Sequence, residues 1–279
     1  MDLTFNIEET VRRRYSVRNY SDQTVEDRTI LDIKTFVQSL DNPFDRDITF
    51  HFLDLKEALE SEKLGTYGVI KGARHFIGTT IKTEPMVLEA LGYEFEVAVL
   101  HLASLGLGTC WLGGTFDRKG FAGAMEVGPD ELFPIISPFG YPAEKKHLKE
   151  LAMRTLIQAD QRKPWHELFF HENFETALAE DAAGEYRLAL EMVRLGPSAS
   201  NKQPWRVLLK DGSFHFYENK SPGYSTSFPY DIQKIDLGIA AAHFHLSALE
   251  RRLAGQFEIT PPDVVLPDHM VYEFSWIPE

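Results

Sequence analysis

The sequence predicts an α+β fold whose two halves resemble each other. Helical and strand-like patterns alternate along the 279 residues, 43% of which are hydrophobic, so the chain can bury a sizeable core. Two short segments recur, because residues 50–56 resemble residues 214–220 and residues 101–105 resemble residues 245–249. This similarity indicates either an internal duplication or chance matches between amphipathic segments.

The first half begins with a capped amphipathic helix and continues into two strands. Ser21, Asp22 and Thr24 precede apolar residues that recur at helical spacing over residues 30–40. Residues 48–52 alternate between apolar and polar side chains, which is typical of a half-buried strand. A second, more apolar strand is predicted over residues 75–81.

A long apolar helix is predicted over residues 87–105. Gly106 and Gly108 follow it as stop signals, because glycine readily adopts the backbone that ends a helix. We expect short strands after this helix at residues 110–112 and 132–141.

The second half is predicted to contain the same kinds of element. We expect helices over residues 147–157 and 186–195, strands over residues 205–210 and 214–218, and a last long helix over residues 231–253. If the recurring segments are duplicates, the first half carries an insertion of roughly twenty residues around residues 66–81.

The charge balance excludes several classes of function. With 42 acidic against 29 basic side chains, the net charge is −13, which opposes general binding to nucleic acid or to an anionic membrane. Any anion site must therefore be local. Acidic residues such as Glu89 and Glu94 interrupt the apolar stretch at 85–107, so it favours a buried helix over a membrane span. Residues 1–9 do not read as a signal peptide, and we expect a cytoplasmic protein.

Cysteine and histidine usage favours neither disulfides nor metals. The single cysteine, Cys110, cannot form an intrachain disulfide, which fits a reducing compartment. His243 and His245 stand two residues apart on a predicted helix, where their side chains point apart, so we expect no metal site.

Two arginines and a serine stand at alternate positions directly after a short helix that ends in Arg12 and Arg13. In an extended segment, Arg14, Ser16 and Arg18 face the same way. Two guanidinium groups and a hydroxyl at one point suit a phosphate group, which they can bind through charge-assisted hydrogen bonds. The alternative is a solvated basic stretch, which is the commoner meaning of clustered arginines.

Two further loops could offer polar groups to a ligand. Residues 196–205 read Gly-Pro-Ser-Ala-Ser-Asn-Lys-Gln-Pro-Trp, and their short polar side chains can satisfy the edge of a polar heterocycle. A plain helix-to-strand connection with local caps is the alternative. Residues 106–114 end in a pair of glycines that lets a ligand approach the main chain, although a plain turn explains them equally well.

In combination, these motifs resemble the FMN-dependent nitroreductase family over nearly the whole chain. The resemblance is carried by Arg14-x-Ser16-x-Arg18 and by residues 106–114, 140–144, 162–164 and 197–205. Members are usually intertwined homodimers in which each flavin contacts the arginine motif of one subunit and the Pro-Ser-x-x-Asn loop of the other. In ordinary members this loop lies a few tens of residues after the arginine motif, where this chain has only Asp-Asn-Pro-Phe-Asp at residues 41–45.

The chain is therefore similar to the subgroup of this family in which one chain mimics the dimer. The resemblance implies a nitroreductase-like fold, with a central, mostly antiparallel sheet flanked by helices and two fused pseudo-symmetric halves. Residues 1–170 would carry the arginine and Gly-Gly motifs, and residues 171–279 would supply the Pro-Ser-x-x-Asn loop, in one intertwined body. We expect a monomer with one FMN site, while a homodimer stays open.

The resemblance also implies which residues bind FMN. The phosphate and neighbouring ribityl or pyrimidine oxygens would be held by Arg14, Ser16, Arg18 and Arg162. From the second half, the residues expected to pack on the cofactor are Pro197, Ser198, Ala199 and Asn201. Those expected beside the isoalloxazine ring are Leu112, Gly113 and Gly114. Residues 66–68 are a further candidate to reach the ring.

The implied activity is that of an oxidoreductase. NADH or NADPH, bound transiently, would pass hydride through FMN to a nitroaromatic, a quinone or a similar planar small molecule in a ping-pong reaction. Because the cofactor carries this chemistry, no catalytic residue is predicted. The alternative is a non-catalytic flavin-binding or flavin-sensing protein of the same fold. It is motivated by the loop missing from the first half and by Gly113, which replaces a glutamate common in the family.

Overall fold

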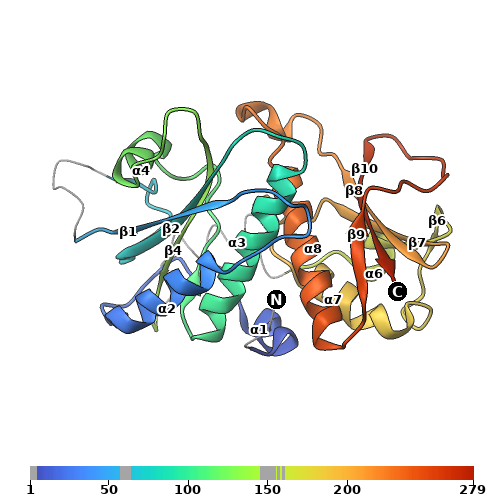
Figure 1. Ribbon diagram of the computed structural model, residues 1–279, viewed down its shortest axis with the longest axis horizontal. Helices are drawn as coiled ribbons and strands as arrows, with labels where there is room; N and C mark the ends of the chain where they lie inside the picture. The colour runs from blue at the N-terminus through green and yellow to red at the C-terminus, as the bar shows by residue number, and fades with distance from the viewer. Residues whose placement is uncertain (1–4, 57–63, 145–154, 156–157, 159–160) are drawn as a thin grey trace.

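Two long helices run through the middle of the molecule, and a sheet lies on either side of the pair (Figure 1). In the computed structural model, which describes residues 5–56, 64–144, 155, 158 and 161–279, these helices are α3 (Val87–Ser104) and α8 (Gln233–Glu250). Nearly all of their residues are buried, because both helices are apolar on every side. Both predicted long helices are thus confirmed.

The central helices meet backbone to backbone where Gly92 faces Gly238. A Cβ atom added at Gly92 would lie 2.1 Å from the carbonyl oxygen of Ile235, and one added at Gly238 would lie 1.9 Å from that of Glu89. No side chain fits at these distances, so the crossing requires glycine at both positions.

The first sheet contains β1 (Thr49–Asp54), β2 (His75–Ile81), β3 (Gly108–Thr109) and β4 (Leu132–Gly140) in the order β1-β2-β4-β3. All of its pairings are antiparallel. The helix α2 (Asp27–Gln38) packs beside α3 and contributes Ile33 and Val37 to the core between them and the sheet. The strand predicted over residues 110–112 is wrong, because β3 ends at Thr109 and Leu112 forms only an isolated bridge to Ile136.

The second sheet runs in the order β6-β5-β7-β8-β10-β9. Its strands are β5 (Phe169–His171), β6 (Asn173–Ala177), β7 (Trp205–Lys210), β8 (Ser213–Asn219), β9 (Gly255–Glu258) and β10 (Met270–Pro278). Only the pairing of β5 with β7 is parallel. The predicted strands over residues 205–210 and 214–218 are confirmed as β7 and β8.

Short helices complete the part of the chain that the structure describes. They are α1 (Ile7–Arg13), α4 (Arg118–Ala124), α6 (Trp165–Leu168), α7 (Arg187–Leu195) and the 3-10 turns at Gly184–Tyr186, Ala199–Asn201 and Tyr224–Ser227. The helix predicted over residues 186–195 is α7. The helix predicted over residues 147–157 falls on a segment of which the structure describes only residue 155.

The two halves repeat the same arrangement. The series α2, β1, β2, α3, β3, β4 corresponds to α7, β7, β8, α8, β9, β10, and the sheet order β1-β2-β4-β3 corresponds to β7-β8-β10-β9. The halves are therefore topological duplicates, as the fused pseudo-symmetric fold requires.

The recurring segments found in the sequence do not mark equivalent positions. Residues 50–56 begin on β1, whereas residues 214–220 lie on β8, which corresponds to β2. If Gly92 is matched to Gly238, residue 101 corresponds to residue 247 (101 + 238 − 92), and the predicted helix match is two residues out of register.

The extra residues in the first half also lie elsewhere than expected. β1 and β2 are joined by residues 55–74, whereas β7 and β8 are joined by a turn of only Asp211 and Gly212. The insertion therefore precedes β2, and residues 75–81 belong to the repeated core.

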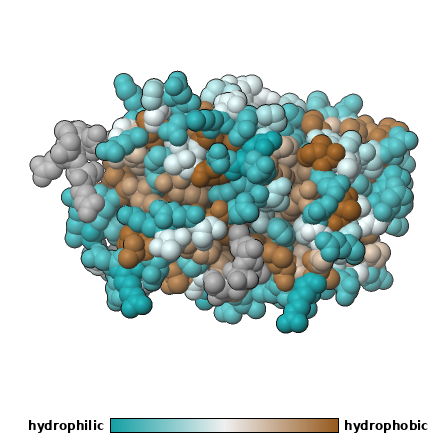
Figure 2. Space-filling model, viewed as in Figure 1, coloured by the Kyte–Doolittle hydropathy of each residue, from teal (hydrophilic) through white to brown (hydrophobic). Residues whose placement is uncertain are grey.

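Hydrophilic side chains cover much of the molecular face shown in Figure 2, and apolar residues reach this surface in separate places. This surface agrees with the net charge of −13. Among the described residues, no helix has both the length and the apolar character needed to cross a membrane.

Candidate functional site

A cavity of about 420 Å³ lies where the two halves meet. The first half contributes the segment after α1, the loop after β3 and part of β4. The second half contributes the connection between α7 and β7 and one face of α8. The predicted site residues that line it are Arg14, Ser16, Arg18, Gly113, Arg162, Pro197, Ser198, Ala199 and Asn201. Residues far apart in the sequence therefore converge on one site.

The arginine motif is extended and rests against β3. Ser16 forms a parallel bridge with Thr109, and the Val17 amide donates to the Thr109 carbonyl at 2.8 Å. This backbone geometry gives Arg14, Ser16 and Arg18 the alternation that the sequence predicts, and all three line the cavity.

Guanidinium groups of this motif carry donors that no described residue accepts. Arg14 Nη1 and Arg18 Nε are buried and have no hydrogen-bond partner among the described residues. A buried donor without a partner is costly unless a ligand or water satisfies it. Four arginines and one aspartate line the cavity in the described part of the chain, so its field is locally positive in an acidic protein. These groups fit a phosphate.

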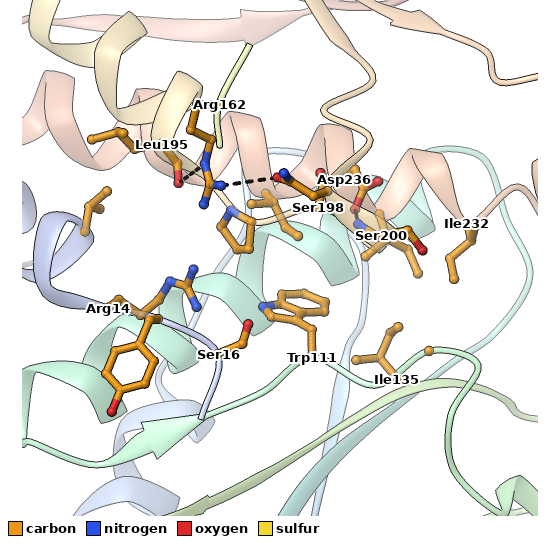
Figure 3. A pocket seen from close by; sticks show the side chains of 18 of the residues that line it. Arg14, Ser16, Trp111, Ile135, Arg162, Leu195, Ser198, Ser200, Ile232 and Asp236 are labelled. Atoms are coloured by element: carbon orange, nitrogen blue, oxygen red, sulfur yellow. Dashed lines mark hydrogen bonds between the residues drawn. The ribbon is translucent and has the colours of Figure 1, made fainter. Parts of the chain in front are cut away.

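Arg162 joins the arginine end from the connection between the halves. Its Nε donates to the Leu195 carbonyl at 3.2 Å, and its Nη1 donates to Asn201 Oδ1 at 3.2 Å, as the dashed lines in Figure 3 show. In the same view Arg14 and Arg162 lie at one end of the cavity, and Ile232 and Asp236 lie at the other. Two of the arginines that line the cavity therefore lie together at one of its ends.

The connection between α7 and β7 is shaped by its own polar side chains. Ser200, Asn201 and Gln203 have left-handed backbones, with φ of 48°, 56° and 50°. The side-chain Nδ2 of Asn201 donates to the backbone carbonyls of Gln158 and Gln161 at 2.8 and 2.9 Å. Ser198 Oγ accepts from the backbone amide of Gln203 at 2.8 Å. Asn201 therefore holds this loop against Arg162, a role that the sequence does not predict.

The glycine-rich loop places an aromatic ring in the cavity. The Trp111 indole lies between the two ends in Figure 3, and its Nε1 donates to Glu96 Oε2 at 2.8 Å. The other oxygen of Glu96 bonds His243 Nε2 at 2.9 Å, and both of these side chains are fully buried. One buried carboxylate therefore fixes Trp111 to α3 and α8 together.

Gly113 is closely packed at the cavity wall. A Cβ atom there would lie 2.9 Å from Ile232 Cδ1 and 3.1 Å from Ile135 Cδ1, closer than ordinary contacts. Both atoms are the ends of flexible side chains, so a larger residue at this position requires the isoleucines to shift.

Three predicted positions do not line this cavity. The Leu112 side chain is buried in the core, and its backbone pairs with that of Ile136. Neighbouring side chains of an extended segment point in opposite directions, so the preceding residue, Trp111, faces the cavity instead. Gly114 instead lies against Phe228. Residues 66–68 lie outside the cavity wall, in the turn where Thr66 Oγ1 accepts from the Ile70 amide.

The sequence also misses several lining residues. These are chiefly Trp111, Ile232 directly before α8, and the α8 residues Ile235, Asp236 and Ile239. The α8 set recurs at spacings of three and four, which is a helical face, but an almost wholly buried helix gives no sequence signal of which face meets a ligand. Trp111 lies within the glycine-rich motif at residues 106–114, and this position could have indicated that it lines the cavity.

The fold and the site define an α+β protein in which two fused, topologically equivalent halves enclose a cavity with arginines at one end and with Ile232 and the buried Asp236 at the other. Residues 6–248 match the family model described as "Putative TM nitroreductase". The chain belongs to this family, as the motifs predict.

One solved structure shares the fold over the whole chain. It is described as "a putative nitroreductase" from Thermotoga maritima, has a TM-score of 0.62 and 21% identity, and the match covers 99% of this chain and 95% of that one. An FMN-dependent nitroreductase from Clostridium difficile matches with 22% identity and a TM-score of 0.41, covering 49% of this chain and 88% of that one. A structure described as "a putative nitroreductase in complex with FMN" from Desulfovibrio desulfuricans matches with 22% identity and a TM-score of 0.41, covering 53% of this chain and 96% of that one. No curated protein matches this chain.

Proposed function

We propose that the protein is an FMN-dependent oxidoreductase that takes hydride from NADH or NADPH and passes it to a planar acceptor such as a nitroaromatic or a quinone. The observation that carries the proposal is the polarity of the cavity. Arg14 and Arg18, each with a buried donor that has no partner among the described residues, line the cavity. Its other end is formed by Ile232 and Asp236, and the Trp111 indole lies between the two ends. This pattern suits an elongated ligand with a phosphate at one end and a flat ring at the other.

The chain's own residues would bind and orient the cofactor. Arg14, Ser16, Arg18 and Arg162 would neutralise the phosphate, and Ser198 and Ser200 offer hydroxyls along the wall formed by the second half. The isoleucines and Trp111 would exclude water from the ring. When bound, FMN would supply the reversible acceptance and release of hydride.

Anaerobic stopped-flow spectroscopy tests the activity. We expect NADH or NADPH to bleach the visible absorption of the FMN-loaded protein, and a nitroaromatic or quinone to restore it. Bound FMN that neither nucleotide bleaches would instead identify a non-catalytic flavin-binding protein. A protein that is colourless when purified and binds no added FMN would contradict both functions.

Arg14→Ala should weaken FMN binding about tenfold to a hundredfold, since a charge-assisted hydrogen bond to the phosphate is lost. Asn201→Ala should weaken it less, because Arg162 keeps its charge and its bond to Leu195. Quenching of flavin fluorescence during titration gives the dissociation constants.

Arg13→Ala is the matched control for the change in net charge. Arg13 donates to the Ala103 carbonyl at 3.0 Å and does not line the cavity. If Arg13→Ala weakens FMN binding as much as Arg14→Ala does, the assignment of the phosphate to the arginine motif is wrong.

A further inference from the structure

Asp236 is a buried carboxyl group in the wall of the cavity. Its residue is only 3% exposed, and it lies at the end of the cavity opposite Arg14 and Arg162 in Figure 3. Oδ1 accepts from the Ala199 amide at 3.0 Å, which ties α8 to the loop of the second half. Oδ2 is buried and has no hydrogen-bond partner among the described residues.

The groups that face Asp236 oppose its ionisation. Burial raises the pKa of Asp236 well above its usual range, and the negative charges of Glu218 on β8 and of Asp231 before α8 raise it further. The bond from the Ala199 amide acts in the opposite direction, and its effect is smaller than that of burial but larger than that of either negative charge. Tyr224, in the turn at Tyr224–Ser227, also faces this carboxyl and offers no positive charge.

The nearby lysines are bound to other carboxylates. Lys220 Nζ lies 3.0 Å from Asp231 Oδ2. Lys234 Nζ lies 2.9 Å from Glu89 and 2.6 Å from Glu273. Neither lysine forms an ion pair with the cavity carboxyl, so no salt bridge in the described structure offsets its burial.

We propose that Asp236 is held as a neutral carboxylic acid and donates a hydrogen bond from Oδ2 to an acceptor atom on the heterocycle of the cofactor. The proposal rests on the proposed function, because it takes FMN as the ligand. A neutral acid presents one O–H donor and keeps an acceptor for Ala199, which matches the one used and the one unused oxygen.

The charge state of Asp236 makes the two ends of the cavity chemically different. Arginines at one end select an anion, and the O–H of Asp236 at the other selects a neutral acceptor such as a ring carbonyl or ring nitrogen. An ionised Asp236 would have no donor and would repel electron-rich ring atoms. The residue is therefore a binding residue for the ring and takes no part in a chemical step.

Infrared difference spectroscopy of the wild type against Asp236→Asn tests the protonation state directly. At neutral pH we expect the wild type to show the carbonyl stretch of a protonated carboxylic acid that the variant lacks. Addition of FMN should shift this band, because a hydrogen bond from the acid changes its frequency. A purely structural role would leave the band unmoved by FMN.

FMN titrations of two variants supply the second measurement. Asp236→Asn keeps an acceptor for Ala199 and an N–H donor, so its dissociation constant should stay within about twofold of the wild type. Asp236→Ala removes the donor and should bind FMN about tenfold more weakly. Thermal unfolding of both variants checks that they fold.

The outcomes separate this inference from the proposed function. If FMN binds but the carboxylic acid band is missing or does not move, the role of Asp236 is wrong and the proposed function stands. Equal weakening of FMN binding by Asp236→Asn and Asp236→Ala, or unchanged FMN binding in Asp236→Ala, would also overturn the role of Asp236. If the wild type binds no FMN, both the function and this role are rejected.

Discussion

At the scale of single residues, buried carboxyl groups distinguish this site from an ordinary apolar core. Glu96 is fully buried and satisfied by Trp111 and His243, whereas both oxygens of Glu218 are buried without a hydrogen-bond partner in the described structure. The closest cation to Glu218 is Lys220, with its Nζ 3.6 Å away. Burial of the Glu96 carboxylate is therefore compensated by hydrogen bonds, whereas burial of an ionised Glu218 lowers the stability of the fold.

Glu218→Gln should stabilise the protein at alkaline pH. Burial, and then the charge of Asp231, raise the pKa of Glu218 from 4.5 to about 7. An acid with a raised pKa contributes stability that is fully present below pH 4.5 and is lost as the pH rises through 7. We expect the free energy of unfolding of the variant to exceed the wild-type value by about 2 kcal/mol at about pH 8.5.

Urea denaturation at pH 4.5 and at alkaline pH measures this difference. Near pH 4.5 the difference in free energy of unfolding between Glu218→Gln and the wild type should almost vanish. The control is Glu175→Gln, because Glu175 is exposed on β6. A gain that is the same at both pH values would show that Glu218 is not the titrating group.

Some residues of the candidate site could be predicted from the sequence, and others could not. The alternation of Arg14, Ser16 and Arg18 is a local property, and the extended backbone preserves it. Trp111 and Asp236 could not be assigned in this way, because their hydrogen-bond partners, Glu96 and Ala199, belong to segments brought near only by folding.

At the scale of elements, the crossing of α3 and α8 is the most constrained contact. Gly92 and Gly238 allow the two backbones to touch, and they occupy equivalent places in helices of 18 residues each. Because residues on both sides of the crossing line the cavity or hold its walls, a shift of one helix would distort the site.

Gly238→Ala should destabilise the protein by about 3 kcal/mol or more, since the new methyl would overlap the Glu89 carbonyl at 1.9 Å. Alanine favours an isolated helix over glycine by about 1 kcal/mol, so the steric term must exceed this gain. Chemical denaturation measures the loss.

Gly65→Ala is the matched control, because nothing lies within 4 Å of a Cβ atom there. It should change stability by less than about 0.5 kcal/mol. If Gly238→Ala is as stable as this control, the helices cross elsewhere.

Elements whose apolar residues follow a clear pattern were predictable from the sequence. Elements that also bury charged residues were not. The helices α2, α3, α7 and α8 follow clear apolar patterns, but β10 was missed. It buries Glu273, which pairs with Lys234, in a strand that is otherwise apolar around Phe274 and Trp276. A buried ion pair breaks the pattern that sequence reasoning relies on.

At the scale of the whole molecule, duplication explains why a cavity forms at the junction of the halves. The α7–β7 connection borders this cavity, and its counterpart is the α2–β1 connection at residues 39–48. There Phe44 is 9% exposed and packs with ring centroids 5.8 Å from Phe257 and 5.3 Å from Phe274. In this connection of the first half, aromatic packing against β9 and β10 of the second half thus takes the place of a ligand-binding loop.

We therefore predict one FMN for each chain, bound by the monomer. Light scattering after gel filtration gives the mass, and flavin absorbance gives the stoichiometry. Phe44→Ala should lower stability by about 3 kcal/mol without adding a second FMN, because opening the aromatic cluster supplies no arginine. Two FMN per chain, or binding by dimers alone, would contradict the account of a fused dimer.

The sequence by itself determined the family, the principal helices and strands, and the arginine motif, because these depend on local spacing and composition. The tertiary structure decided which strands of the two halves correspond, where the insertion lies, and that Trp111 and Asp236 face the cavity. These features depend on contacts between distant segments, such as the Gly92–Gly238 crossing, which no local period encodes. The chain that is too acidic to bind anions in general thereby gathers four arginines around one cavity.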